Sequence, residues 1–138
     1  KFRRDVALKI GATRVIDPNS EDVNTAVTNM DVVFECAGAV ETFQQAQNIA
    51  RRGGSVIVLG LTAADVTLEV NPFNIVVNEL RIQGSFLNPL TQGRAAELVE
   101  SGKLNLDILI SKVVDLAGVQ AILDAPPAEG DIKYIACP

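Results

Sequence analysis

Two short apolar runs, each closed by small residues, constrain the fold of this chain most strongly. Asp31 to Gly38 reads DVVFECAG, and Gly53 to Gly60 reads GGSVIVLG. Each run is typical of a strand buried on both faces, and a helical pattern separates the two. A strand, a helix and a strand of this length predict parallel strands joined by a right-handed crossover. Ligands of open parallel sheets bind beyond the carboxyl ends of the strands, so we expect the functional surface around residues 36–38 and 60–61.

The rest of the chain alternates helical and strand patterns, which is typical of an α/β fold. Val66, Leu68 and Val70 alternate with polar residues, which predicts a half-exposed strand over 66–70 at a sheet edge. Residues 106–111 are expected to form a loop or short turn. The other expected helices are residues 3–10, 20–29, 40–52, 73–78 (a short helical or irregular turn), 91–101 and 116–124, and the other expected strands are residues 14–16, 80–86 and 133–136.

The composition is that of a globular protein, with 48% hydrophobic and 21% charged residues among 138. A net charge of -5 argues against a general affinity for nucleic acid or an anionic membrane, because those partners need clustered Lys and Arg. No segment approaches the roughly 18 consecutive apolar residues that cross a bilayer. Cys36, expected to be buried at a strand end, and Cys137 suit reduced thiols of a cytoplasmic protein, and a disulfide between them is the less favoured alternative.

Most conventional catalytic motifs are absent from the sequence. The chain has no His, which excludes Ser-His-Asp and Cys-His nucleophile arrangements within it. Two cysteines without an imidazole do not make an ordinary closed zinc site. Neither G-x-G-x-x-G nor G-x-x-x-x-G-K-[ST] occurs, so the usual phosphate-binding loops are missing. The residues alone therefore predict a parallel α/β domain with a ligand-binding edge, and they indicate no catalytic residue and no metal ligand.

Several segments in order resemble one enzyme family. FRRDVALKIGATRVIDP (2–18), DVVFECAG (31–38) and RRGGSVIVLG (51–60) are similar to the cofactor domain of the zinc-type medium-chain alcohol dehydrogenases. NELRIQGSF (78–86) and AAELVESGKLNLDILIS (95–111) are also similar to that family. Within it, the resemblance is closest to the polyol, sorbitol and threonine dehydrogenases.

The resemblance implies a partial Rossmann-type parallel sheet whose first two strands would precede Lys1. Residues 1–87 would then be a truncated NAD(P)-binding domain, and residues 88–138 a segment that returns to the catalytic domain. Because the chain begins at Lys1 without Met and enters a helical pattern at once, we expect it to be a C-terminal fragment of a longer enzyme.

The resemblance also implies an activity and a set of cofactor-binding residues. The parent enzyme would transfer a hydride between a secondary alcohol and NAD or NADP, with a zinc ion whose ligands lie upstream, and the fragment alone is expected to be inactive. Arg3 would lie near the adenosine ribose, and the three strand ends would meet the rest of the cofactor, the last of them the carboxamide. The implied strand-end residues are Cys36, Ala37, Gly38, Leu59, Gly60, Leu61, Ser85 and Phe86, with Leu87 beside them.

Each of these assignments has a plainer alternative. Arg3 could be a solvated helix charge, Cys36 a buried structural thiol, and the small strand-end residues a product of tight packing. The whole chain could also be a stand-alone nucleotide-binding or interaction module without chemistry.

Two expectations concern the sheet edges. Without the first two strands, residues 14–16 would lose their neighbours and either pair with residues 31–35 or leave a gap that another copy fills. The family resemblance further implies homodimerisation through the edge segments 66–70 and 80–86.

Overall fold

The computed structural model describes residues 1–87, 90–125 and 128–138. The chain forms two compact units. The first, called here the three-strand unit, is Pro18–Leu87, and the second, the two-strand unit, combines Lys1–Asp17 with Asn88–Pro138. None of the described helices is long and apolar enough to span a bilayer.

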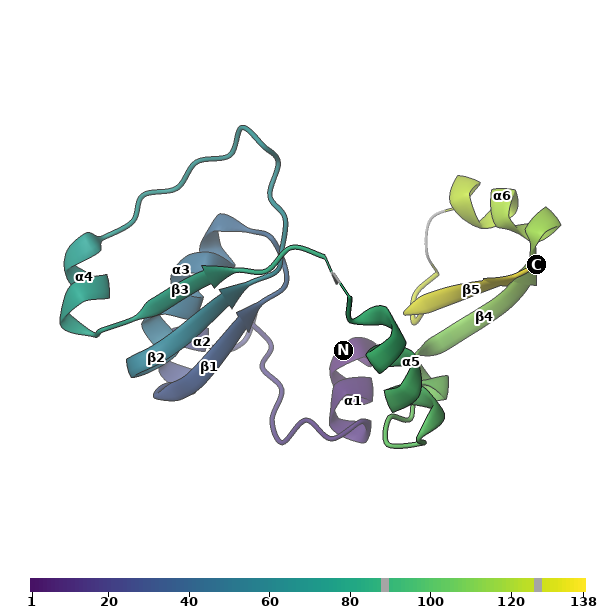
Figure 1. The fold of residues 1–138 in the computed structure, drawn as a ribbon, viewed down its shortest axis with the longest axis horizontal. Helices are drawn as coiled ribbons and strands as arrows, with labels where there is room; N and C mark the ends of the chain where they lie inside the picture. Colours follow the sequence, from purple (N-terminus) through teal and green to yellow (C-terminus); the bar gives the residue numbers. More distant parts are fainter. Residues whose placement is uncertain (88–89, 126–127) are drawn as a thin grey trace. The chain divides into compact units, whose positions relative to one another are not determined.

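The three-strand unit contains a parallel sheet in the order β1-β2-β3 (Figure 1). β1 is Met30–Glu35, β2 is Ala50–Val58 and β3 is Arg81–Gly84. Helix α3, Val40–Ile49, connects the first two strands. Val33 of β1 lies opposite Val56 of β2, which in turn lies opposite Ile82 of β3. The predicted parallel strand–helix–strand unit is therefore confirmed.

One face of this sheet packs against α3, which contacts both β1 and β2. Val56 is fully buried in the centre of the sheet, and Ala46 of α3 is 2% exposed. Val32 and Phe34 point to the opposite face, because side chains alternate along a strand, and they stay 48% and 65% exposed. The prediction that the apolar run of β1 is buried on both faces is therefore wrong.

Three predicted elements of the three-strand unit differ from the structure. The helix expected over 20–29 is only the short α2, Val23–Ala26, which begins at the side-chain cap of Asp22. The helix expected over 40–52 ends at Ile49, because β2 starts at once and its first residues pair across a bulge with β1. Residues 66–70 form no strand, since the three-strand sheet does not extend to them. The short helix expected near 73–78 is confirmed as α4, Pro72–Val77.

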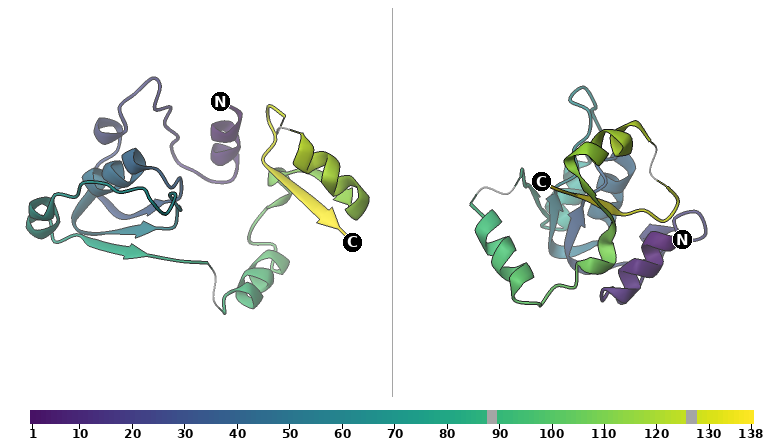
Figure 2. Two further views of the ribbon diagram at one scale, coloured as in Figure 1. Left: turned by 90° about the horizontal axis from the view of Figure 1, so that it is seen from above. Right: turned by 90° about the vertical axis from the view of Figure 1, so that its right-hand side faces the viewer.

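The two-strand unit is built on the parallel pair β4, Ile110–Asp115, and β5, Lys133–Cys137, and helix α6, Leu116–Asp124, contacts both strands (Figure 2). The loop or short turn expected over 106–111 contains a 3-10 helix, and its last two residues begin β4, a strand that the sequence analysis did not predict. The Asp115 carboxylate accepts a hydrogen bond from the Gly118 N–H at 2.8 Å and so caps the N-terminus of the helix expected over 116–124, which is confirmed as α6. The other elements of this unit are α1 Phe2–Lys9, α5 Gln92–Glu100 and the 3-10 helix Asp107–Leu109.

Residues 14–16 do not form the predicted strand. β1 is an edge strand whose only sheet neighbour among the described residues is β2, so the sheet does not rearrange to take in residues 14–16. A three-residue strand has too few backbone hydrogen bonds to form without a neighbour already in register.

Candidate functional site

The carboxyl ends of β1, β2 and β3 lie next to one another, because the three strands are parallel and adjacent (Figure 1). The N–H of Leu59 and the N–H of Gly60 both donate to the Glu35 carbonyl oxygen, at 2.8 and 3.0 Å. The Ser85 N–H donates to the Val58 carbonyl oxygen at 2.9 Å. The parallel pairing, extended by these bonds, brings eight predicted site residues to one edge: Cys36, Ala37, Gly38, Leu59, Gly60, Leu61, Ser85 and Phe86. We call this set the strand-end edge.

Two glycines let the first two strand ends touch backbone to backbone. A Cβ atom on Gly60 would lie 2.1 Å from the Gly38 nitrogen, and one on Gly38 would lie 2.4 Å from the Leu61 carbonyl oxygen. Gly38 also has a φ of +70°, in the left-handed region that favours glycine. Tight packing therefore accounts for both glycines, whatever ligand the edge binds.

Glu35, the last residue of β1, is a buried carboxylate that the sequence reasoning missed. It is 4% exposed, and its Oε1 atom accepts hydrogen bonds from the Ala37 N–H at 2.8 Å and the Gly38 N–H at 2.9 Å. The hydroxyl of Thr42, in the first turns of α3, donates to the same oxygen at 2.7 Å. The available signal was an acidic residue closing an apolar run directly before small residues, since such a side chain must find partners once it is buried.

Two opposing effects act on the pKa of the Glu35 carboxyl. Burial raises the pKa, while the hydrogen bonds from Thr42 and from the backbone of Gly38, Ala37 and Ala39 lower it. The bonds together outweigh burial, so the pKa lies below its ordinary value. Glu35 is therefore a carboxylate at neutral pH, and it acts as an acceptor for the loop that follows it.

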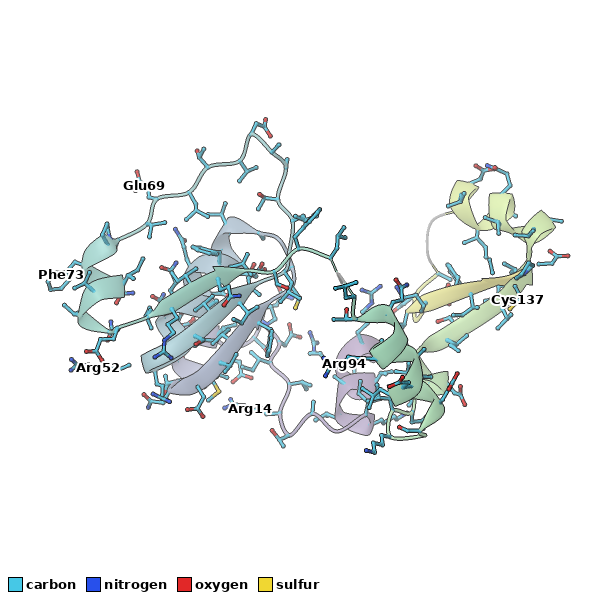
Figure 3. The ribbon with its side chains drawn as sticks, viewed as in Figure 1. Arg14, Arg52, Glu69, Phe73, Arg94 and Cys137 are labelled. Atoms are coloured by element: carbon cyan, nitrogen blue, oxygen red, sulfur yellow. The ribbon has the colours of Figure 1, made fainter. Side chains whose placement is uncertain are left out.

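Cys36 is exposed, so the prediction of a buried thiol is wrong. It follows Val32 and Phe34 in the strand alternation and so lies on the same open side of the sheet as those residues. Cys137, at the end of β5, is also exposed (Figure 3). Both thiols are free in the structure.

Apolar side chains border the strand-end edge. Leu61 and Leu87 are each 74% exposed, and Phe86 is 67% exposed. Leu87 has a φ of +53°, an uncommon conformation for a residue with a Cβ atom. Adjacent exposed apolar side chains of this kind mark a surface that binds a ligand or a partner.

Arg3 is the one predicted site residue outside the strand-end edge. It lies in α1 of the two-strand unit, where its guanidinium donates to the Asp131 carbonyl oxygen at 3.4 Å. Its assignment to the adenosine ribose stays a prediction.

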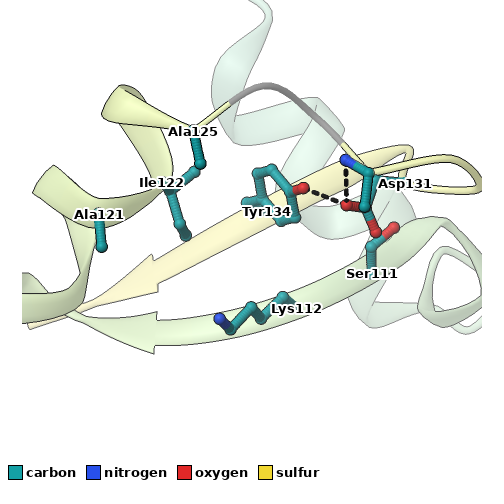
Figure 4. A pocket seen from close by; sticks show the side chains of 8 residues that line it. Ser111, Lys112, Ala121, Ile122, Ala125, Asp131 and Tyr134 are labelled. Atoms are coloured by element: carbon teal, nitrogen blue, oxygen red, sulfur yellow. Dashed lines mark hydrogen bonds between the residues drawn. The ribbon is translucent and has the colours of Figure 1, made fainter.

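A separate hollow of about 290 Å³ lies in the two-strand unit (Figure 4). Inside it the Tyr134 hydroxyl donates to the Asp131 carboxylate, and this bond raises the pKa of Tyr134 above its ordinary value. Asp131 also accepts from the Ala128 N–H at 3.0 Å, so the carboxylate holds the turn that leads into β5. These groups therefore have partners within the unit, and their contacts are structural.

Metal ligands do not gather among the described residues of either unit. Among residues 1–87, 90–125 and 128–138, no group of three or more His, Cys, Asp or Glu side chains could hold a metal ion. The described residues therefore do not offer the three or four ligands that a zinc ion in an enzyme needs.

Comparison of the sequence with known proteins identifies a family of relatives. The sequence pattern of the zinc-binding dehydrogenases matches residues 1–102. An L-threonine 3-dehydrogenase from Pyrococcus horikoshii is 36% identical over 118 residues, which are 80% of this chain and 34% of that protein. A Rhizobium meliloti protein named as a D-xylulose reductase is 36% identical over 110 residues, which are 75% of this chain and 30% of that protein. The chain thus spans about a third of the length of these curated relatives.

A solved structure supports the same placement. A Sinorhizobium meliloti 1021 protein, described as a zinc-binding dehydrogenase and bound to NADP, superposes with a TM-score of 0.93 at 37% identity. The match covers 99% of this chain and 42% of that protein. The likeness confirms the α/β fold class with a Rossmann-like parallel sheet. Sequence pattern, relatives and fold all agree, and the chain belongs to the zinc-binding dehydrogenase family.

Proposed function

We propose that this chain is part of an NAD(P)-dependent, zinc-type alcohol or polyol dehydrogenase, in which it forms part of the cofactor-binding surface. The observation that carries the proposal is the strand-end edge, where three parallel strand ends lie together with exposed apolar side chains beside them. The NADP-bound relative at 37% identity supports this choice of ligand.

When bound in its oxidised form, the cofactor would accept a hydride from the carbon that carries the hydroxyl group of a secondary alcohol. The alcohol also loses its hydroxyl proton, and the product is a ketone. The chain's own residues would bind and orient the cofactor. The backbone of 59–61 and 85–87 would approach the nicotinamide ring and its carboxamide, and the loop 36–38 would meet the cofactor beside them. Leu61 and Phe86 would shield the ring from water.

The zinc ion would be held by residues outside this chain, because the described residues offer no suitable ligand set. The substrate class is a small alcohol with a secondary hydroxyl, in keeping with relatives named for xylulose and threonine. We also propose homodimerisation through the edge strand β3 and the segment 66–70, because β3 has backbone groups at the sheet edge that another strand can pair with.

The test is to isolate the intact polypeptide from its source, determine its mass, and assay it with NAD or NADP against polyols and threonine. We expect a polypeptide about two to three times longer than this chain. It should form reduced nicotinamide only when an alcohol is present, and zinc chelation should abolish the activity. A polypeptide that begins at Lys1 and forms no reduced nicotinamide would refute the proposal. Light scattering of the same sample tests the dimer, and a monomer at high concentration would exclude it.

A further inference from the structure

We infer that Glu35 is a positioning residue, whose carboxylate holds the loop 36–38 against the end of β2 and so fixes the shape of the strand-end edge. The anchoring itself follows from the contacts of Glu35. Its effect on a nicotinamide cofactor rests on the proposed function.

Glu35 connects four separate pieces of backbone. Its side-chain Oε1 binds the two N–H groups of the loop, from Ala37 and Gly38, and the hydroxyl of Thr42 in α3. Its carbonyl oxygen accepts from Leu59 and Gly60 at the end of β2. One residue thus ties β1, the loop, α3 and β2 together at the place where the ligand is expected.

The surroundings of the second carboxylate oxygen suit this role. A Cβ atom on Gly60 would lie 2.6 Å from Glu35 Oε2, so the glycine leaves the space that the carboxylate occupies. The donors around Oε1 are N–H and O–H groups, and hydrogen bonds to an ionised acceptor are roughly twice as strong as those between neutral groups. A neutral side chain of the same shape would therefore hold the loop less firmly.

The anchoring also determines which groups the loop offers to a ligand. The N–H groups of Ala37 and Gly38 point inward to the carboxylate, so they do not donate to the ligand. The loop then contacts the ligand through its outer surface, where Cys36 is exposed. Losing the carboxylate would release both N–H groups and let the loop move away from the end of β2.

The experiment compares four variants: Glu35→Ala, which removes the acceptor; Glu35→Gln, which keeps its shape without the charge; Thr42→Val, which removes one donor; and Glu79→Gln. Glu79 is exposed in the same unit, lies outside the strand-end edge and the proposed dimer segments, and serves as the control. Two quantities are measured, namely amide hydrogen exchange at Ala37 and Gly38 in the 138-residue chain, and the KM for the dinucleotide in the intact polypeptide.

We expect Glu35→Ala to increase the exchange rates of both amides about tenfold, beyond any increase at amides that exchange only through global unfolding. In the intact polypeptide it should raise the KM for the dinucleotide about tenfold, with a smaller change in kcat. Glu35→Gln and Thr42→Val should fall between Glu35→Ala and wild type, and Glu79→Gln should match wild type. Unchanged exchange in a folded Glu35→Ala variant would overturn the inference, as would an equal effect in Glu79→Gln.

Two further outcomes remain decisive. If Glu35→Ala does not fold, the Thr42→Val variant becomes the test. Amide exchange rates and a dinucleotide KM equal to those of the wild type in Thr42→Val would then overturn the inference. If the intact wild-type protein uses no dinucleotide, the proposed function fails, and the amide exchange alone decides whether Glu35 anchors the loop.

Discussion

Replacing Gly60 with Ala tests the close approach of the first two strand ends. The new Cβ atom would lie 2.1 Å from the Gly38 nitrogen, whereas ordinary contact begins at 3.4 Å, so the two backbones must separate by about 1.3 Å (3.4 minus 2.1). Such overpacking costs about 1–3 kcal/mol, and we expect the upper end because backbone atoms cannot rotate away. The movement also strains the 3.0 Å bond from the Gly60 N–H to Glu35, which adds about 1 kcal/mol.

We therefore expect Gly60→Ala to lower the free energy of unfolding of the three-strand unit by about 3 kcal/mol or more, equivalent to a fall in Tm of roughly 12 °C. Far-UV circular dichroism during heating and urea denaturation measures both quantities. Gly84→Ala is the matched control, because a Cβ atom there would meet nothing within 4 Å, and its effect should stay within about 0.5 kcal/mol. Equal stabilities of the two variants would refute the reasoning.

Three smaller predictions follow from single contacts. Asp115→Ala removes the cap of α6 and should cost about 1 kcal/mol in urea denaturation, whereas Asp115→Asn keeps an acceptor and should cost little. Arg51→Gln breaks an exposed ion pair with Asp31 and should change the free energy of unfolding by less than about 0.5 kcal/mol, so a larger loss would mean that the pair is not merely a surface contact. Because the folded-state pKa of Glu35 is lowered, its carboxylate contributes stability above the ordinary pKa of 4.5 and loses that contribution as pH falls through the lower folded value. The stability gap between wild type and Glu35→Gln should therefore shrink in acid, and a gap independent of pH would contradict the assignment.

The sequence predicted the parallel unit and the edge at which its strands end, because both depend on local patterns. The runs 31–38 and 53–60 carry enough β-branched and apolar residues to form strands, and α3 between them requires a crossover. The parallel arrangement then brings 36–38, 59–61 and 85–87 to one edge, whatever their side chains are.

The errors arose where structure depends on a neighbour that the sequence does not specify. Residues 14–16 and 66–70 have strand-like residues, but the described sheets do not extend to them. Conversely, β4 has an unremarkable pattern and forms because β5 lies beside it in parallel register. The exposure of Cys36 depends on which face of the sheet α3 covers, and a continuous apolar run does not indicate that.

Glu35 was missed because its importance lies in three-dimensional contacts. Ala37 and Gly38 are close to it in sequence, but Thr42 and Gly60 reach it only after α3 and β2 have packed. A search for chemical motifs weighs residues by type and spacing, and a single Glu at a strand end matches none of them.

Alkylation of Cys36 with and without dinucleotide tests the central claim most directly. Cys36 lies on the strand-end edge, and Cys137, the other exposed thiol, lies in the two-strand unit and serves as the internal reference. Mass spectrometry of the modified peptides gives the two rates in one sample. We predict that saturating NAD or NADP slows alkylation of Cys36 and leaves the rate at Cys137 unchanged. Equal rates at Cys36 with and without either dinucleotide would contradict the account.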